Sequence, residues 1–295
     1  MAFRSGFISI IGCPNAGKST LLNQLVGQKI SIVSDRAQTT RNRIVGVVNG
    51  QDIQMVFLDT PGITGSKNKL GDYMQKTAAD ALRDVEAVIF LIDGEHGIGE
   101  RDGKIIRMLS GAKAPVIAAV NKIDCIKQAE AEEICNELRG MNCFSDICCI
   151  SALNGTGLDD LLKTTEKYLT DGPKYYPDDM VTDQPERIIC AEMIREQTLK
   201  MIRDEIPHGI GVSIDRVSYR DEKNLADIYA TIYCERDSHK GIIIGKKGEM
   251  LRKIGAASRK DIEMMMNCKV NLQIWVKVKE DWRNKPAVLH ELGYE

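Results

Sequence analysis

The sequence lacks any long apolar run. None of the apolar stretches in its 295 residues approaches the roughly 18 residues of a membrane-spanning helix. The N-terminal residues also lack the apolar segment of a secretory signal. No internal repeat or low-complexity tract is visible. We therefore expect a cytoplasmic protein without a transmembrane segment.

The cysteines and histidines argue against disulfides and zinc. The nine cysteines are odd in number and show no C-x-x-C spacing, as expected for small core residues in a reducing compartment. The histidines are dispersed and form no zinc-ligand pattern. Ser-His-Asp, Cys-His and paired-carboxylate arrangements are also missing, so the sequence offers no catalytic constellation of these kinds.

Length and composition bound the architecture without identifying it. A chain of 295 residues, 43% of them hydrophobic, is long for one domain and comfortable for two. Its net charge of -2 indicates no class of partner. We expect a first domain at residues 1–170, a turn-rich linker at 171–185 and a second domain at 186–295.

Residues 12–19 read Gly-Cys-Pro-Asn-Ala-Gly-Lys-Ser and match the phosphate-binding pattern G-x-x-x-x-G-K-[ST]. An apolar strand is expected before the motif at 7–11, and a helix after it at 19–26. The two glycines let the backbone wrap closely around phosphate oxygens, while Lys18 reaches the terminal phosphates and the Ser19 hydroxyl can ligate magnesium. The motif therefore predicts a nucleoside triphosphate site that uses Mg²⁺.

The segment Asn-Lys-Ile-Asp at 121–124 selects the base. Guanine presents N1–H and the 2-amino group as neighbouring donors, and a buried Asp124 carboxylate in a desolvated slot can accept from both. Adenine lacks the 2-amino group, so guanine is predicted. The motif follows a strand-like run, and open α/β sheets bind ligands at the carboxyl ends of strands. Ser151 and Ala152 follow the next such run, where a backbone N–H is expected to donate to guanine O6.

Asp59-Thr60-Pro61-Gly62 also ends a strand-like run and carries switch chemistry. Asp59 is placed to hold magnesium through water, and the Gly62 amide can donate to the γ-phosphate, a contact that is lost on hydrolysis. Thr39 and Thr40 precede the next strand, where one threonine can close over the metal. The sequence does not decide which of the two does so.

These motifs, in this order and spacing, resemble the translation-factor-related small GTPases and, within them, the Era family. The likeness is carried by residues 12–23, by 32–41 and by the whole C-terminal half. It implies a GTPase that binds small-subunit ribosomal RNA near its 3′ end and assists maturation of the small ribosomal subunit. The expected fold is α/β, a P-loop GTPase domain with a doubly wound, mostly parallel sheet, followed by an α+β type II KH domain.

The predicted site residues can now be given together. The nucleotide is expected to contact Asn15, Ala16, Gly17, Lys18, Ser19, Thr20, Asp59, Gly62, Asn121, Lys122, Asp124, Ser151 and Ala152. Residues expected to act in catalysis are Lys18, Thr40, Gly62 and Asn15. Candidates for the magnesium ligands are Ser19, Thr39, Thr40 and Asp59.

Hydrolysis is expected to be slow without help. In Ras-like GTPases a glutamine after the D-x-x-G glycine orients the attacking water, whereas this chain has Ile63, which cannot hydrogen-bond there. Our hypothesis is that Asn15 helps to hold K⁺ beside the phosphates, as in potassium-stimulated relatives with asparagine at that loop position. The alternative, that Asn15 only shapes the loop, is weighted equally.

The second domain shows a different order of elements. Helix is expected at 186–206, strands at 212–219 and 227–234, then helical segments, then a strand at 270–278. That order matches a type II KH domain. A short helix is expected within 286–294.

Ile-Ile-Ile-Gly-Lys-Lys-Gly at 242–248 contains the G-x-x-G of KH proteins. Its glycines permit a tight turn against which a nucleic-acid backbone can pack. Seven basic residues and one acidic residue lie between positions 240 and 260, an excess that favours RNA over a solvated helix face. The predicted RNA-binding residues are Gly245, Lys246, Lys247, Gly248, Arg252 and Lys253.

A KH groove reads about four unstacked bases against an apolar floor, so single-stranded RNA is the predicted ligand. Candidate floor residues, most of them also expected in the core, are Ile242, Ile243, Ile244, Ile254 and one face of the strand that carries Ile274. Trp275 and Trp282 are expected to pack within the fold more often than to stack on bases.

The sequence as a whole predicts a GTP-regulated RNA-binding protein. The expected cofactor is Mg²⁺, joined by K⁺ under the Asn15 hypothesis, with GTP or GDP as ligand. The expected partners are small-subunit ribosomal RNA and the small ribosomal subunit. A monomer is expected, and a peripheral association with the inner face of the cell membrane is left open. Two alternatives also stay open: an RNA-binding protein with a structural, rarely hydrolysed nucleotide, and a GTPase acting on a non-RNA partner.

Overall fold

A computed structural model of the chain describes residues 2–34, 36, 39–62, 68–202 and 209–294. The contacts divide the chain into two compact units, which are treated separately below. The first unit comprises Met1–Ser31, Thr40–Gly65 and Met74–Asp183, and the second comprises Ile32–Thr39, Ser66–Tyr73 and Gln184–Glu295. The second unit is therefore assembled from three separate stretches of sequence.

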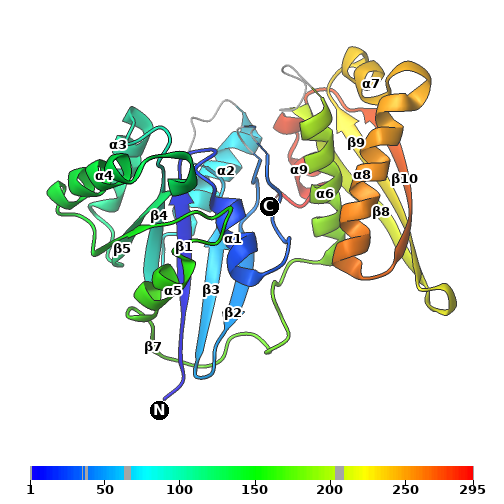
Figure 1. Ribbon diagram of the computed structural model, residues 1–295. Helices are drawn as coiled ribbons and strands as arrows, with labels where there is room; N and C mark the ends of the chain where they lie inside the picture. The colour runs from blue at the N-terminus through cyan, green and yellow to red at the C-terminus, as the bar shows by residue number, and fades with distance from the viewer. Residues whose placement is uncertain (1, 35, 37–38, 63–67, 203–208, 295) are drawn as a thin grey trace. The chain divides into compact units, whose positions relative to one another are not determined.

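The first unit is built on a 7-stranded sheet in the order β2-β3-β1-β4-β5-β6, with β7 paired to β1 (Figure 1). Its strands are β1 (Arg4–Gly12), β2 (Ile44–Asn49), β3 (Ile53–Asp59), β4 (Ala87–Asp93), β5 (Val116–Asn121), β6 (Asp146–Cys149) and β7 (Thr170–Asp171). Its helical segments are α1 (Lys18–Val26), α3 (Glu100–Leu109), η1 (Ile123–Cys125), α4 (Gln128–Gly140) and α5 (Leu158–Glu166), and α2 (Lys69–Asp80) is divided between the units after Tyr73.

The central strands of this sheet run parallel. β1 pairs with β3 and with β4 in parallel, as do β4 with β5 and β5 with β6, whereas β2 and β7 pair antiparallel to their neighbours. Parallel strands need crossover helices, which cover both faces and leave the strands buried. The predicted doubly wound, mostly parallel α/β fold is confirmed, and it brings the carboxyl ends of β1, β3 and β5 to one edge.

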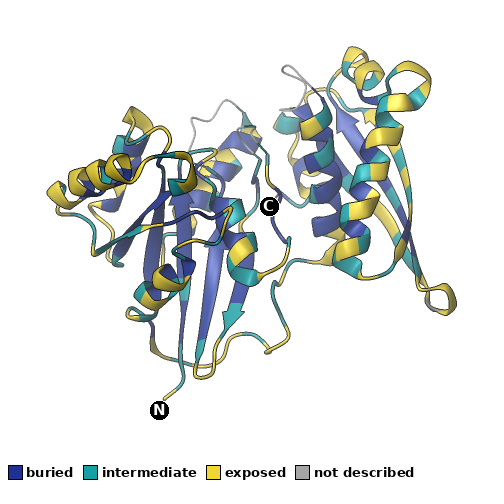
Figure 2. Ribbon diagram, viewed as in Figure 1, coloured by how far each residue is buried: buried dark blue, intermediate teal, exposed yellow. Residues whose placement is uncertain are grey.

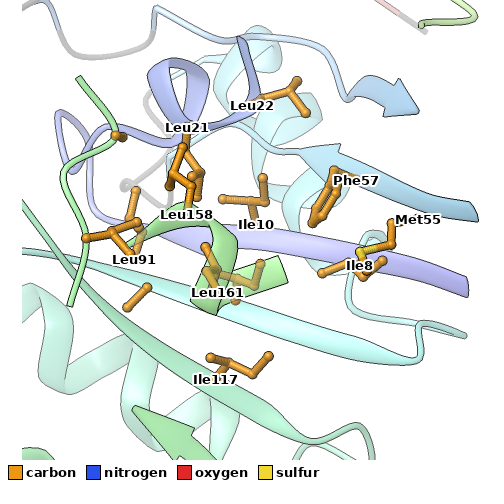
Figure 3. Packing of buried hydrophobic residues seen from close by; sticks show 14 of the residues in the cluster. Ile8, Ile10, Leu21, Leu22, Met55, Phe57, Leu91, Ile117, Leu158 and Leu161 are labelled. Carbon is orange, nitrogen blue, oxygen red and sulfur yellow. The ribbon is translucent and has the colours of Figure 1, made fainter. Parts of the chain in front are cut away.

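Two apolar clusters lie on opposite faces of the sheet. Successive residues of a strand point to opposite faces, and accordingly Ile10 belongs to the cluster under α1 and α5, whereas Ile11 belongs to the one under α3 and α4. Figure 3 shows Leu21 of α1 and Leu161 of α5 packed with Ile10 over the sheet. This packing fixes the start of α1, where the phosphate-binding motif lies.

The second unit contains a three-stranded sheet in the order β10-β9-β8. Its elements are α6 (Glu186–Met201), β8 (Gly211–Arg220), η3 (Asp221–Lys223), β9 (Leu225–Cys234), α7 (Asp237–Ile244), η4 (Lys246–Gly248), α8 (Glu249–Met266), β10 (Lys269–Val278), η5 (Trp282–Asn284) and α9 (Pro286–Glu291). β8 pairs antiparallel with β9, and β9 pairs parallel with β10. The predicted order of helix, strand, strand, helix, helix and strand is confirmed.

The core of the second unit lies between the sheet and α6, α7 and α8. Ile243 and Ile254, two predicted groove residues, are fully buried in this core. Trp282 is also fully buried and donates its indole N–H to the carbonyl of Gly209 at 2.8 Å, so it has no free ring face for a base. The yellow outward faces of α7 and α8 in Figure 2 contrast with the largely buried β9 of the sheet.

The predicted linker 171–185 is largely packed on the first unit. The Gln54 side chain accepts hydrogen bonds from the amides of Tyr175 and Tyr176 at 2.7 and 3.0 Å, and donates to the Tyr176 carbonyl at 2.8 Å. The Val47 amide donates to the Val181 carbonyl at 2.9 Å. The division between the units falls after Asp183, inside the predicted segment.

Candidate nucleotide and nucleic-acid sites

The phosphate-binding loop joins β1 to α1 in a backbone shape that its residues suit. Gly17 has φ +98°, and a Cβ added there would lie 2.3 Å from the Asn121 amide nitrogen. Asn15 is left-handed at φ +67°, a region that asparagine tolerates better than most residues. The half-buried Thr20 follows Lys18 and Ser19 in the first turn of α1. Backbone amides at such a helix start attract anions.

Lys18 is buried inside the loop and spans it. Its Nζ donates to the carbonyl oxygens of Gly12 and Cys13 at 3.0 and 2.9 Å. Burial lowers the pKa of Lys18, while the nearby Asp59 carboxylate acts in the opposite direction. The ammonium is therefore held at the centre of the loop, where phosphate oxygens can replace the two carbonyls as acceptors.

Three predicted magnesium ligands converge beside Lys18. The Ser19 hydroxyl lies 2.8 Å from that of Thr40 and donates to Asp59 Oδ2 at 2.7 Å. Asp59 is fully buried, and burial raises its pKa against the opposing charge of Lys18. Its other oxygen, Oδ1, has no hydrogen-bond partner within the described part of the chain. Two hydroxyls and a carboxylate with an unpaired buried oxygen suit a hard, oxygen-seeking cation such as Mg²⁺.

The two candidate threonines point in different directions. Thr40 joins Ser19, as described above, whereas the Thr39 hydroxyl donates to the Arg36 carbonyl at 2.5 Å. Thr39 belongs to the second unit and Thr40 to the first. Gly62 lies against the phosphate-binding loop, since a Cβ there would be 3.2 Å from Pro14. Ile63 lies outside the described residues.

Asn121 ties together two of the nucleotide loops. Its amide nitrogen donates to the Ala16 carbonyl at 2.8 Å, and its oxygen accepts from the Ala152 amide at 2.9 Å. The Ser151 amide donates to the Thr156 carbonyl at 3.0 Å. Both amides that the sequence offers as donors to guanine O6 therefore donate within the protein in this geometry. In this geometry the two residues support Asn121.

Asp124 is exposed, whereas the sequence argument placed its carboxylate in a desolvated slot. It lies in η1, a short turn beyond β5, and the adjoining loops do not cover it. A hydrogen bond from the Ser151 hydroxyl lowers the pKa of Asp124, so the side chain is an ionised acceptor at neutral pH. Lys122, at φ +65°, donates through Nζ to Asp93 at 2.6 Å.

The G-x-x-G segment forms a tight turn between α7 and α8. Gly245 and Gly248 have φ +71° and +77°, and Lys247 between them has φ +52°. A Cβ on Gly245 would lie 2.7 Å from the Met250 Cβ. Lys246 and Lys247 are exposed. The turn therefore presents two lysines and a closely approachable backbone, as contact with phosphates requires.

A groove of about 350 Å³ begins at this turn. It is lined by Gly248, Leu251, Arg252, Gly255, Ala256, Arg259, Leu272 and Ile274. Its floor is apolar and its rim carries two arginines, one of which, Arg252, donates to the Lys247 carbonyl at 3.0 Å. Lys253 is exposed and pairs with Glu249 at 3.0 Å, outside the groove lining.

Sequence reasoning missed several of these residues. Of the five isoleucines predicted for the floor, only Ile274 lines the groove. Leu272 lies two residues before it, on the strand face that was predicted for the floor. Leu251 was missed, although it lies four residues before Gly255 on one face of α8, so helical periodicity offered a signal. Ser31, which donates to Asp59 Oδ2 at 3.0 Å, was also missed, and no motif marks it.

Within the residues that the structure describes, no helix is both long enough and apolar enough to cross a lipid bilayer.

Comparisons with known proteins agree with both halves of this geometry. Residues 7–122 match a family model described as 50S ribosome-binding GTPase, and residues 205–283 match the KH domain model. The chain is 50% identical over 293 residues to GTPase Era of Clostridioides difficile, covering 99% of each chain. It is 49% identical over 295 residues to GTPase Era of Alkaliphilus metalliredigens, covering 100% of each.

Solved structures show the same fold along the whole chain. One is Era in complex with MgGDPNP and nucleotides 1506–1542 of 16S ribosomal RNA, at 39% identity, TM-score 0.93 and 99% coverage of both chains. Another is a single-residue variant of Aquifex aeolicus Era bound to GDP and AlF4⁻, at 39% identity, TM-score 0.94 and the same coverage.

Proposed function

This chain belongs to the Era family of GTPases, and from that premise we propose that it hydrolyses GTP, binds single-stranded RNA near the 3′ end of small-subunit ribosomal RNA, and assists assembly of that subunit. The observation that carries the proposal is the presence in one chain of two preformed sites: the cluster of Ser19, Thr40 and Asp59 beside Lys18, and the basic-rimmed groove beside the G-x-x-G turn.

In the proposed nucleotide site, Lys18 and the amides of residues 15–20 hold the phosphates. Ser19, Thr40 and Asp59 would hold Mg²⁺, which neutralises charge on the phosphate oxygens when it is bound. Thr40 is proposed as the threonine that meets the metal, because its hydroxyl faces Ser19 while that of Thr39 faces a backbone carbonyl. The Gly62 amide is proposed to sense the γ-phosphate.

Base selection is proposed to rest on Asp124. Its carboxylate is ionised and accepts from Ser151, and it can accept from both guanine donors at once. Because the carboxylate is exposed in the protein, we assign selectivity to the matching of donors and acceptors. Asn121, Ser151 and Ala152 act by holding the loops in place.

A monovalent cation is proposed as the substitute for a catalytic glutamine. Asn15 lies in the phosphate-binding loop with its backbone in the left-handed region, and a K⁺ ion beside its side chain would add positive charge next to the phosphates. The support for this role is the loop position and the isoleucine at residue 63.

The nucleotide is proposed to regulate RNA binding through the segment that contains the two threonines. Thr40 belongs to the first unit, and Ile32–Thr39 belongs to the second. Within the second unit, the Val33 amide donates to Glu196 of α6 at 3.1 Å, and Arg195 donates to the Thr39 carbonyl. A change at Thr40 is therefore one peptide bond away from a segment held by α6.

The experiment that tests the function measures affinity for 16S ribosomal RNA nucleotides 1506–1542, the segment in the related complex, without nucleotide, with GDP and with a non-hydrolysable GTP analogue. Salt is held fixed because phosphate contacts make affinity steeply salt-dependent. We expect tighter binding with the analogue, by a factor of about 5 to 150 for a typical coupling. Equal affinity in all three states would mean two independent sites.

A paired variant separates RNA binding from nucleotide chemistry. Lys246→Ala/Lys247→Ala should lose RNA affinity while keeping normal basal GTP hydrolysis, since both lysines lie in the second unit. Lys104→Ala/Lys113→Ala removes the same charge from the first unit and should leave RNA affinity unchanged. A monomeric, cytoplasmic state and a peripheral membrane association stay predictions from the sequence.

A further inference from the structure

One face of the three-stranded sheet in the second unit is not used by the groove. On β10 the residues at even positions, such as Leu272 and Val276, pack into the core with α6, α7 and α8. The residues at odd positions point to the opposite, outer face, and Gln273, Trp275 and Lys277 are exposed there. Figure 1 shows α6 and α8 on one side of the sheet.

A row of three side chains crosses this outer face, one from each strand. Arg216 of β8 lies opposite Tyr229 of β9 in the sheet register. The ring of Tyr229 is stacked with that of Trp275 of β10, with centroids 6.0 Å apart and planes 15° apart. Trp275 is 46% exposed, and Arg216 is exposed as well. A guanidinium, a phenol and an indole therefore form one continuous strip.

The carboxylates on this face are already engaged. Asp227 accepts from Arg220 at 2.5 and 2.9 Å and from Asn271 at 2.7 Å. Asp215 accepts from the hydroxyls of Ser213 and Thr231 at 2.9 and 2.7 Å.

The cations on this face are more available than its acids. Arg216, Lys269 and Lys277 are exposed, and no carboxylate of the described residues lies within ion-pair distance of them. Against these three cations stands the single charge of Asp215. The charge available to a partner is therefore predominantly positive.

The neighbouring end of the face is closed. Tyr233 is 6% exposed, its hydroxyl donates to Glu291 of α9 at 3.2 Å, and Lys279 lies 4.7 Å from its ring centroid. Lys279 is in turn paired with Glu291 at 2.6 Å. The aromatic ring of Tyr233 is thus covered, whereas Arg216 and Trp275 are exposed.

We propose that the strip formed by Arg216, Tyr229 and Trp275 is a second binding surface for single-stranded RNA, separate from the groove. Aromatic rings on an open sheet stack with bases of any sequence, and cations beside them meet the phosphates. A protein partner would favour exposed aliphatic side chains around the rings, and here the neighbours are Gln273 and Lys277.

The two surfaces can serve one RNA strand. β10 is one of the two edge strands of the sheet. Its two faces carry the two surfaces: Leu272 and Ile274 line the groove, and Gln273 and Trp275 face outward. A strand that leaves the groove needs only to pass the edge of β10 to reach the strip. The inference rests on the proposed RNA binding and extends it to flanking nucleotides.

The test compares two probes at one salt concentration. The long probe is 16S ribosomal RNA nucleotides 1506–1542, and the short probe is the shortest piece of it whose binding still depends on Lys246 and Lys247. Trp275→Ala should leave the affinity for the short probe unchanged. It should lower the affinity for the long probe about 5- to 150-fold, as expected for one lost stacked base. Trp275→Phe should retain most of the affinity.

Tyr219→Ala is the matched control. Tyr219 is 54% exposed, lies in the same sheet and faces the helix side, opposite Ala226. Its replacement by alanine should change the affinity for neither probe. An unchanged affinity of Trp275→Ala for the long probe would overturn the inference while the function stands, and would leave the strip to a protein partner. If wild-type protein binds neither probe, the proposed function itself fails.

A second measurement needs no substitution. The chain has two tryptophans, one of them, Trp282, fully buried and the other, Trp275, half exposed. Stacking of a base on Trp275 should quench tryptophan emission with the long probe and leave it unchanged with the short one. Equal quenching by both probes, or none with either, would contradict a separate surface at Trp275.

Discussion

The amide nitrogen of Asn121 lies 2.8 Å from the carbonyl oxygen of Ala16. The contact links the end of β5 to the phosphate-binding loop, and the other end of the same amide holds Ala152. Asn121 is 2% exposed. One buried side chain therefore sets the spacing of three loops that come from distant parts of the sequence.

Replacement of Asn121 by alanine should weaken GTP and GDP binding to the same extent. The change leaves the Ala16 carbonyl and the Ala152 amide without their partner, at a cost of about 1–3 kcal/mol for each buried group. Equilibrium binding of a fluorescent guanine nucleotide measures the effect, with the exposed Asn136→Ala as control. A loss confined to GTP would show that Asn121 acts on the γ-phosphate instead.

Asp124→Asn should change the base specificity of the nucleotide site from guanine to xanthine. An asparagine amide places a donor opposite the guanine 2-amino group, whereas xanthine has a carbonyl oxygen at that position and keeps N1–H. Loss of a hydrogen bond to a charged group costs about 1.5–3 kcal/mol, or roughly 10- to 150-fold in GTP affinity. Competition of GTP and XTP for the variant measures the exchange, and weak binding of both would contradict it.

Asn15→Gly separates the cation hypothesis from loop shaping. Glycine adopts the φ of +67° found at this position without strain, so the loop should keep its shape while the amide is lost. GTP affinity should stay within a few-fold of wild type, and stimulation of hydrolysis by KCl over NaCl should disappear. Stimulation that survives in the glycine variant, or equal wild-type turnover in both salts, would argue against K⁺ at Asn15.

Trp282→Phe should destabilise the second unit. The indole N–H donates to the Gly209 carbonyl in a fully buried position, and phenylalanine leaves that carbonyl unpaired, at about 1–3 kcal/mol. Urea unfolding followed by far-UV circular dichroism measures the loss. Trp275→Phe is the control, because Trp275 donates no such buried bond and should unfold like wild type.

The motifs of the first unit could be placed from the sequence because each is local. A strand, a turn and a helix occupy consecutive residues, so hydrophobic periodicity fixes where Lys18 and Asp59 lie at the sheet edge. The prediction that the Asp124 carboxylate is buried was wrong, because burial is not a local property. Whether a loop is covered depends on chain segments distant in sequence, and the motif says nothing about them.

Adjacent residues were the hardest to separate. Thr39 and Thr40 are residues of the same type and are adjacent in the sequence. Only the path of the backbone directs one hydroxyl to Ser19 and the other to Arg36. Backbone hydrogen bonds of the Ser151 and Ala152 loop leave no mark in the sequence either. The strand side of the groove floor, in contrast, could be predicted from the sequence, because Leu272 and Ile274 are two residues apart and lie on the same face of β10.

The second unit is not continuous in the chain, and this affects how the protein can be cut. A fragment that starts at Gln184 begins at the unit boundary, yet it lacks Ile32–Thr39 and Ser66–Tyr73. Arg195 and Glu196 of α6, fully buried or nearly so, contact the first of these segments. A KH fragment expressed alone would expose these two buried charged side chains and lose their hydrogen bonds, and we expect it to be less stable than the same unit in the whole chain.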